Sequence, residues 1–262
     1  MTGPVPPVEQ VEKAKPEVAD KAALEKQISD APAPTAAATP EVKGADAAVR
    51  DDLGPAETSP KAEAEAKIQQ AAREGVEEEE GHWIKEQGRA GERASMARLQ
   101  AGGEKVTDLN GDHGKSFPLV DVSTDQRIES VKVKGVGEVP DDTLYDRYRY
   151  DLEKMQNPDR AAQAADALQK SGAELPAELG TNPSRDQISG YIQEKGQLAV
   201  PDDHVQGVRD NVSRMAHQVP ERYGLDPDSA TLEQDIQRLT DRIQPIGVTS
   251  DQIAKMQQQV RS

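Results

Sequence analysis

Two neighbouring segments of this chain carry opposite charges where extended structure is expected. In "FPLVDVSTDQRIESVKVKG", residues 117–135, the apolar residues are typical of two strands joined by the short connection "TDQ". Asp121 lies in the first expected strand and Lys132 in the second. A carboxylate or an ammonium buried alone is costly, so each needs the other or a ligand. Two interpretations follow, a simple cross-strand ion pair or a ligand-binding site.

Side-chain alternation divides the second strand between two faces. The polar and basic residues share one face, and the acid lies on the other. The two sets are Ile128, Ser130, Lys132 and Lys134, against Glu129, Val131 and Val133. A regular strand would therefore point Glu129 away from Lys132.

Elements that precede this hairpin can bring a second acid to it. The segment "GHWIKEQGRAGERASMARLQAGG" predicts a helix over about 82–100 that carries Glu92 and ends at Gly102 and Gly103. A short strand, "EKVTDLN", and a turn-rich loop, "NGDHGKS", follow. The expected order is a helix with Glu, a strand, a strand with Asp and a strand with Lys.

The segments "GERASMARL", "KVTDLN", "FPLVDVS" and "RIESVKVKG", in this order, resemble the PD-(D/E)xK, or restriction-endonuclease-like, nuclease superfamily. More narrowly, they resemble its compact bacterial toxin or effector domains. The resemblance covers residues 82–135, about a fifth of the chain. It implies an α/β (α+β) fold, with a small restriction-endonuclease-like core around a short mixed sheet. The closing helix and strand of that core would lie in residues 142–200.

The resemblance also implies a mechanism with Glu92, Asp121 and Lys132 as catalytic residues. Asp121 would bind Mg²⁺, for which Mn²⁺ can substitute, because hard cations prefer oxygen ligands. Glu92 would assist the metal or the water. Lys132 would orient or activate the attacking water and stabilise charge on the phosphate. The metal would act as a Lewis acid and lower the pKa of its bound water.

One position departs from the family pattern. Ser130 stands two residues before the lysine, where the family usually has Asp or Glu. Either Glu92 supplies the missing carboxylate, or a bulge turns Glu129 toward the metal, or the site is inactive. Because toxin-type relatives also carry Ser here, we expect an active site with Asp121, Glu92 and Glu129 as candidate metal ligands.

A second segment combines aromatic and basic residues. The stretch "TLYDRYRYDLEK", residues 143–154, interleaves three tyrosines with Arg147 and Arg149. Such a pattern can stack on and follow nucleic acid. We favour packing here, because Tyr148 shares a helical face with Leu144 and Leu152.

Composition limits the remaining possibilities. The net charge is −16, which by itself argues against a nucleic-acid partner, but residues 81–135 hold 9 basic against 8 acidic residues. There is no cysteine, so disulfides and thiolate metal sites are excluded. We find no apolar run long enough for a transmembrane helix and no apolar core of a cleavable signal peptide.

The chain divides into four expected parts. They are a disordered Pro/Ala/Glu-rich arm at 1–60, a solvated helical linker at 61–80, a nuclease-like core at 81–200 and a helical C-terminal region at 201–262. Within the core, Ser184 is expected to cap a helix over about 184–195, and "QLAV" to form a short strand. In the C-terminal region, a helical apolar pattern runs through Leu232, Ile236, Leu239 and Ile243, and a second one through Ile253, Met256 and Val260.

The resemblance implies a metal-dependent nuclease that hydrolyses DNA phosphodiester bonds, in the role of a bacterial toxin or antagonistic effector. Its partners would be DNA and, by analogy, a cognate immunity protein, with no membrane and no small-molecule cofactor. It would be cytoplasmic or delivered by a specialised secretion system. The alternative is a non-enzymatic helical adaptor, or a secretion or virion component, with a degenerate nuclease-like hairpin.

Overall fold

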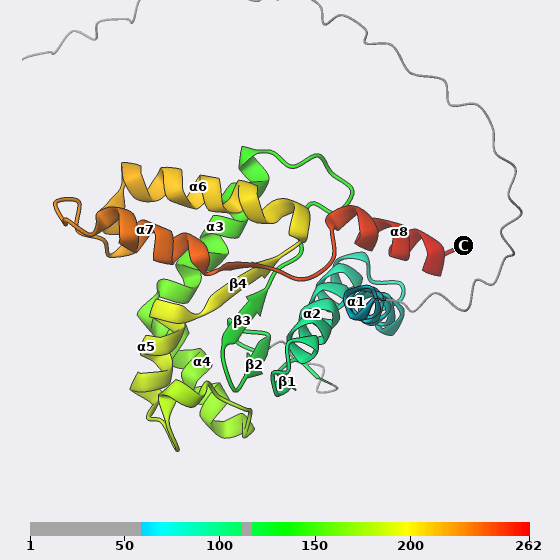
Figure 1. Ribbon diagram of the computed structural model, residues 1–262, viewed down its shortest axis with the longest axis horizontal. Helices are drawn as coiled ribbons and strands as arrows, with labels where there is room; N and C mark the ends of the chain where they lie inside the picture. The colour runs from blue at the N-terminus through cyan, green and yellow to red at the C-terminus, as the bar shows by residue number, and fades with distance from the viewer. Residues whose placement is uncertain (1–58, 112–116) are drawn as a thin grey trace, which may run out of the picture. The chain divides into compact units, whose positions relative to one another are not determined.

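A five-stranded mixed sheet organises the computed structural model, which describes residues 59–111 and 117–262 (Figure 1). The strands follow one another across the sheet in chain order. They are β1 (Val106–Asp108), β2 (Val122–Thr124), β3 (Ile128–Val131), β4 (Gln197–Val200) and β5 (Ile243–Pro245). The first three pair antiparallel, and β4 and β5 continue the sheet in parallel with β3. The short mixed sheet expected from the sequence is confirmed.

Helices cover both faces of this sheet and enclose two apolar cores (Figure 1). One layer contains α1 (Pro60–Glu78), α2 (Trp83–Ala101) and α8 (Ser250–Val260). The other contains α3 (Asp142–Gln156), α4 (Pro158–Ser171), α5 (Arg185–Lys195), α6 (Val205–Gln218) and α7 (Leu232–Asp241). The alternation of the strands explains the two cores, because Ile128 packs into the second layer and Val131 into the first. The described residues therefore form a mixed α/β fold.

Helix α1 differs from the solvated linker expected at 61–80. Ile68, Ala72 and Val76 recur at helical spacing and are buried in the core shared with α2 and α8. The close approach is possible at Gly75, where an added Cβ would lie 2.6 Å from the main-chain oxygen of Arg89. The three apolar residues of α1 are therefore sufficient for packing because α2 provides an apolar surface opposite them. Except for its last two residues, the arm expected at 1–60 lies outside the described residues.

The expected helical C-terminal region, 201–262, also supplies a strand. The helical apolar pattern includes Ile243, but α7 ends at Asp241 and Ile243 begins β5. Leu198 on β4 is paired in register with Ile243. Ile243 is fully buried on the sheet, so its apolar character serves a strand rather than another helical turn.

Local sequence signals correctly predicted α5 and β4. Ser184 forms a capping box with Gln187 at the start of α5, as its sequence position indicated. The segment "QLAV" is strand β4. Among the described residues, no helix combines the length and apolar character needed to cross a membrane.

Candidate functional site

Asp121 lies where β2 and β3 separate. Its main-chain N donates to Glu129 O at 2.9 Å, and the main-chain N of Val131 donates to Asp121 Oδ2 at 2.7 Å. The Asp121 carboxylate therefore accepts the hydrogen bond that a main-chain carbonyl would accept in a regular antiparallel pair. Leu119, with φ at 68°, marks the turn by which the preceding chain leaves the sheet. This irregular backbone fixes the Asp121 side chain between two diverging strands.

Lys132 meets the same carboxylate from the end of β3. Its Nζ lies 2.7 Å from Asp121 Oδ2, while its main-chain N donates to Ala199 O on β4 at 2.9 Å. The Lys132 side chain remains 30% exposed, whereas that of Asp121 is 8% exposed. The pair therefore combines a buried acid with an ammonium that can still reach solvent.

Glu92 joins the group through Asn110. One amide, Asn110 Nδ2, donates to Glu92 Oε1 at 2.8 Å and to Asp121 Oδ1 at 2.9 Å. Asn110 is itself fixed, because its Oδ1 accepts a hydrogen bond from Phe117 N and its main-chain N donates to Asp108 Oδ1. The structure thus brings Glu92, Asp121 and Lys132 into one hydrogen-bonded group. We name this group, with Asn110, the carboxylate site.

Asn110 was not predicted as a site residue. Its sequence signal was the turn-forming "DLNG", which indicated a loop and gave no indication of a bridge between two acids. Only the return of the chain to Asp121 gives the amide its role.

The electrostatics of the carboxylate site centre on Glu92. Burial raises the pKa of Glu92, and the neighbouring charge of Asp121 raises it further. Arg89, whose Nη1 lies 3.0 Å from Glu92 Oε2, opposes both effects without cancelling them. Arg89 is shared, because it also binds Asp108 at 2.8 Å and Glu78 at 2.7 Å. Two carboxylates therefore face each other with incomplete compensation, which a cation between them would relieve.

Glu129, the third candidate metal ligand, is held elsewhere. Its Oε2 accepts a hydrogen bond from Ser95 Oγ at 2.6 Å, and its Oε1 lies 2.8 Å from Arg98 Nη2. Both partners lie on α2, and Glu129 is fully buried between α2 and the sheet. The regular alternation of β3 is retained, so its side chain is engaged with α2 rather than with Asp121.

Ser130 takes the position beside Asp121 instead. Its Oγ lies 3.4 Å from Asp121 Oδ2, and the residue is 1% exposed. At the place where the superfamily usually has an acid, this chain offers a neutral hydroxyl.

The residues present fit a Mg²⁺ ion only in a specific way. Among residues 59–111 and 117–262, no three His, Asp or Glu side chains are placed to hold a metal together. Mg²⁺, however, keeps several waters and is often held by one or two carboxylates together with substrate phosphates. Glu92 and Asp121 provide such a pair, although Glu92 also binds Arg89 and Asp121 also binds Lys132. The donor set suits a metal that is completed by water and substrate.

Comparison with known proteins adds no further constraint. No protein-family model, no curated protein and no solved structure matches this chain. The function must therefore be argued from the geometry of the carboxylate site.

Proposed function

We propose that this protein is a metal-dependent nuclease that hydrolyses DNA phosphodiester bonds, with a PD-(D/E)xK-like core. The observation that carries the proposal is the convergence of Glu92, Asp121 and Lys132 at the separation of β2 and β3. Three residues from three separate elements meet there, in the chemical types that phosphodiester hydrolysis needs.

The chain order of the elements also supports the proposal. A helix that carries Glu92 precedes three antiparallel strands; Asp121 comes directly before β2 and Lys132 directly after β3. Three helices then lead to β4, which pairs in parallel with β3. The sequence resemblance implies a closing helix and strand within residues 142–200, and these helices and β4 lie in that range.

The side chains of the carboxylate site would divide the chemistry among them. Asp121 and Glu92 would hold Mg²⁺, which supplies Lewis acidity and a bound water of lowered pKa. Lys132 would donate to a phosphate oxygen of the substrate, since its side chain is 30% exposed. Asn110 would keep the two carboxylates at a fixed separation. Ser130 would offer a hydrogen bond where relatives of the usual pattern offer a charge.

The biological setting proposed is that of a bacterial toxin or antagonistic effector. A delivered nuclease of this kind needs a cognate immunity protein in the cell that makes it, and this partner is inferred by analogy.

The proposal is tested by DNA cleavage. Purified full-length protein is mixed with supercoiled plasmid and Mg²⁺ or Mn²⁺, with parallel reactions in EDTA. We expect metal-dependent cleavage that Asp121→Asn and Lys132→Met each reduce by at least about 100-fold. Lys195→Met is the matched control, because Lys195 forms a surface ion pair with Glu178 away from the carboxylate site.

Two outcomes would overturn the proposal. One is the absence of cleavage by folded protein with either metal, and the other is cleavage that survives in both site variants. The first result would favour the non-enzymatic adaptor, and the second would show that the cleavage does not come from the carboxylate site.

A further inference from the structure

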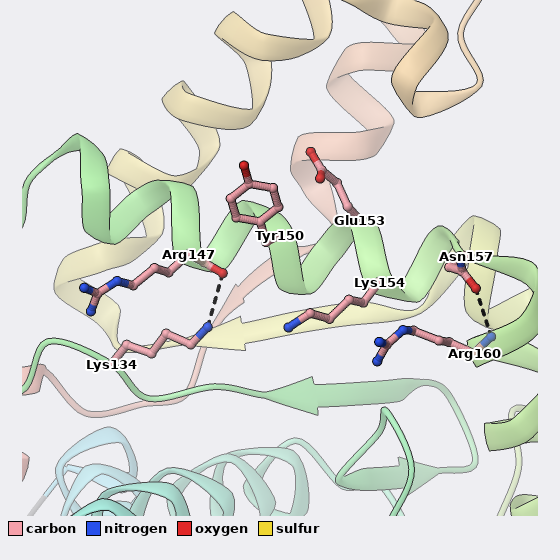
Figure 2. A pocket seen from close by; sticks show the side chains of 7 residues that line it. All are labelled: Lys134, Arg147, Tyr150, Glu153, Lys154, Asn157 and Arg160. Atoms are coloured by element: carbon pink, nitrogen blue, oxygen red, sulfur yellow. Dashed lines mark hydrogen bonds between the residues drawn. The ribbon is translucent and has the colours of Figure 1, made fainter.

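A pocket of about 480 Å³ lies along α3, on the sheet face opposite α2 (Figure 2). Its lining is dominated by basic side chains and includes one acid. The lining residues are Lys134, Arg147, Tyr150, Glu153, Lys154, Asn157 and Arg160. In Figure 2 the four basic side chains follow one another beside α3, in the order Arg147, Lys134, Lys154, Arg160. We name this feature the α3 pocket.

The positive charge of the α3 pocket is only partly compensated. Asp151, a buried acid, binds both Lys134 and Lys154, so one carboxylate serves two ammonium groups. Within the described part of the chain, the guanidinium groups of Arg147 and Arg160 form no ion pair with an acid, although the protein carries a net charge of −16. An acidic protein that leaves two arginines unpaired beside two lysines has a local preference for anions.

The acid in the lining does not oppose this preference. Glu153 accepts hydrogen bonds from Arg149, Arg222 and the hydroxyl of Tyr223. Both arginines also lie against the ring of Tyr150, with guanidinium carbons 4.6 Å and 5.6 Å from its centroid. Glu153 is thereby neutralised by residues behind the pocket wall, and Tyr150 is held in place as part of that wall.

The chain that leaves β3 links the carboxylate site to the α3 pocket, because Lys132 belongs to the first and Lys134 lines the second. Lys132 binds Asp121, Val133 packs against Gly91 on α2, and Lys134 reaches Asp151 on α3, so alternation persists beyond the end of β3. Lys132 and Lys134 are two residues apart in extended chain, a distance of about 7 Å. Successive phosphates of a nucleic-acid strand have a similar spacing. Burial lowers the pKa of Lys134; the bound Asp151 carboxylate opposes this effect, and the nearby charges of Lys154 and Lys132 add to it, so that the pKa remains below its ordinary value. An anion bound here would relieve that repulsion.

We propose that the α3 pocket binds the backbone phosphates of the nucleic-acid strand that the carboxylate site cleaves. The inference rests on the proposed function and adds where the substrate strand runs. Arg147 and Arg160 contact phosphates directly, and Lys134 and Lys154 add positive charge between them. Arg147 and Lys154 lie seven residues apart, about 10 Å along the helix, so the pocket is long enough for more than one phosphate.

The test measures binding without cleavage. A fluorescent single-stranded oligonucleotide is titrated with full-length protein in EDTA, by anisotropy, over a range of salt concentrations. We expect Arg147→Ala with Arg160→Ala to weaken binding about tenfold or more, and to lower the slope of log affinity against log salt by roughly 1.4, because two phosphate contacts are lost. The matched control is Lys67→Ala with Lys255→Ala, which removes two exposed charges from α1 and α8 in the other helical layer.

A competition experiment tests whether the α3 pocket prefers a nucleic-acid strand to other anions. At equal ionic strength, we expect neither inorganic phosphate nor polyglutamate to displace the oligonucleotide at concentrations where an unlabelled oligonucleotide does. Displacement by polyglutamate at matched charge would overturn the inference in favour of an acidic polypeptide, and displacement by phosphate would reduce the pocket to a simple anion site.

The two proposals can fail separately. Unchanged affinity and salt slope in the pocket variant, or no binding by the wild-type chain, would overturn the inference even if plasmid is cut. Pocket-dependent binding without metal-dependent cleavage would support phosphate binding by the α3 pocket and overturn the nuclease.

Discussion

Asp121 and Glu129 are buried acids on adjacent strands, and their surroundings differ in kind. Glu129 is fully buried and paired with the guanidinium of Arg98 and the hydroxyl of Ser95. Asp121 is paired with an ammonium that reaches solvent, and it shares the Asn110 amide with a second acid, Glu92. One acid is matched with a base inside the fold, whereas the other belongs to a cluster with surplus negative charge.

Glu129 therefore belongs to a stabilising ion pair, whereas Asp121 belongs to a site suited to a ligand. A buried acid with its own arginine gains nothing from a cation, and its loss leaves the arginine without a partner. When the negative charge of two neighbouring carboxylates is only partly balanced, the two groups repel each other, and a bound cation reduces this repulsion. The comparison therefore predicts that stability and activity depend on different members of the two groups.

The largest effect is expected from Glu129→Ala. This change leaves Arg98, whose side chain is 20% exposed, beside an emptied and apolar cavity. We expect the free energy of unfolding to fall by about 3 kcal/mol, measured by urea denaturation. A change below about 1 kcal/mol would contradict the structural role given to the pair.

The next effect concerns activity. Asp121→Asn keeps an acceptor for Val131 N and removes the charge, so we expect plasmid cleavage to fall at least about 100-fold while the free energy of unfolding changes by less than about 1 kcal/mol. Arg98→Ala is the matched comparison and should do the reverse, with lower stability and cleavage retained by the folded fraction. If both variants lost both stability and cleavage, the Glu129–Arg98 pair and the carboxylate site would not have separate roles.

Local patterns in the sequence were sufficient for much of the fold. Ser184 at the start of α5 and the alternation that places Glu129 opposite Lys132 follow from a few neighbouring residues, and both agree with the structure. Strand β5 was missed because Ile243 fits a helical pattern as well as a strand, and only β4 decides between them. The docking of α1 was missed for a similar reason, since its apolar stripe has meaning only against α2.

The candidate site shows the same limit. The acid and the lysine could be proposed from strand spacing, and Glu92 from the order of elements. Asn110 and Arg89 could not, because their roles depend on which acids the folded chain brings within 3.0 Å. The basic character of the α3 pocket was only partly visible in the sequence. The segment with Arg147 was noted for its tyrosines and arginines, but Lys134, which follows β3, and Arg160 on α4 join it only in space.

The smallest effect tests the surplus charge directly. Glu92→Gln removes a carboxylate whose pKa is raised, first by burial and then by Asp121. A raised pKa in the folded state means that the wild type loses stability as pH rises from the ordinary glutamate value through the folded value. We expect the variant to escape this loss, so that without metal its Tm equals that of the wild type near pH 4 and exceeds it by about 2 to 4 °C at pH 7, measured by scanning calorimetry.

Asp108→Asn is the matched control, because Asp108 binds the same arginine but responds in the opposite direction. Burial alone would raise the pKa of Asp108, yet Arg89 and the main-chain amides of Gly111 and Asn110 hold it below its ordinary value. Its contribution to stability is present above the ordinary aspartate pKa and is lost as pH falls through the lower folded value, so Asp108→Asn should lower Tm at pH 7.

Mg²⁺ should raise the Tm of the wild type more than that of Glu92→Gln, because only the wild type has both carboxylates to share the ion. A Glu92→Gln variant that is less stable than the wild type at pH 7 would show that Arg89 compensates Glu92 fully, and that the two acids hold no surplus charge for a metal to relieve.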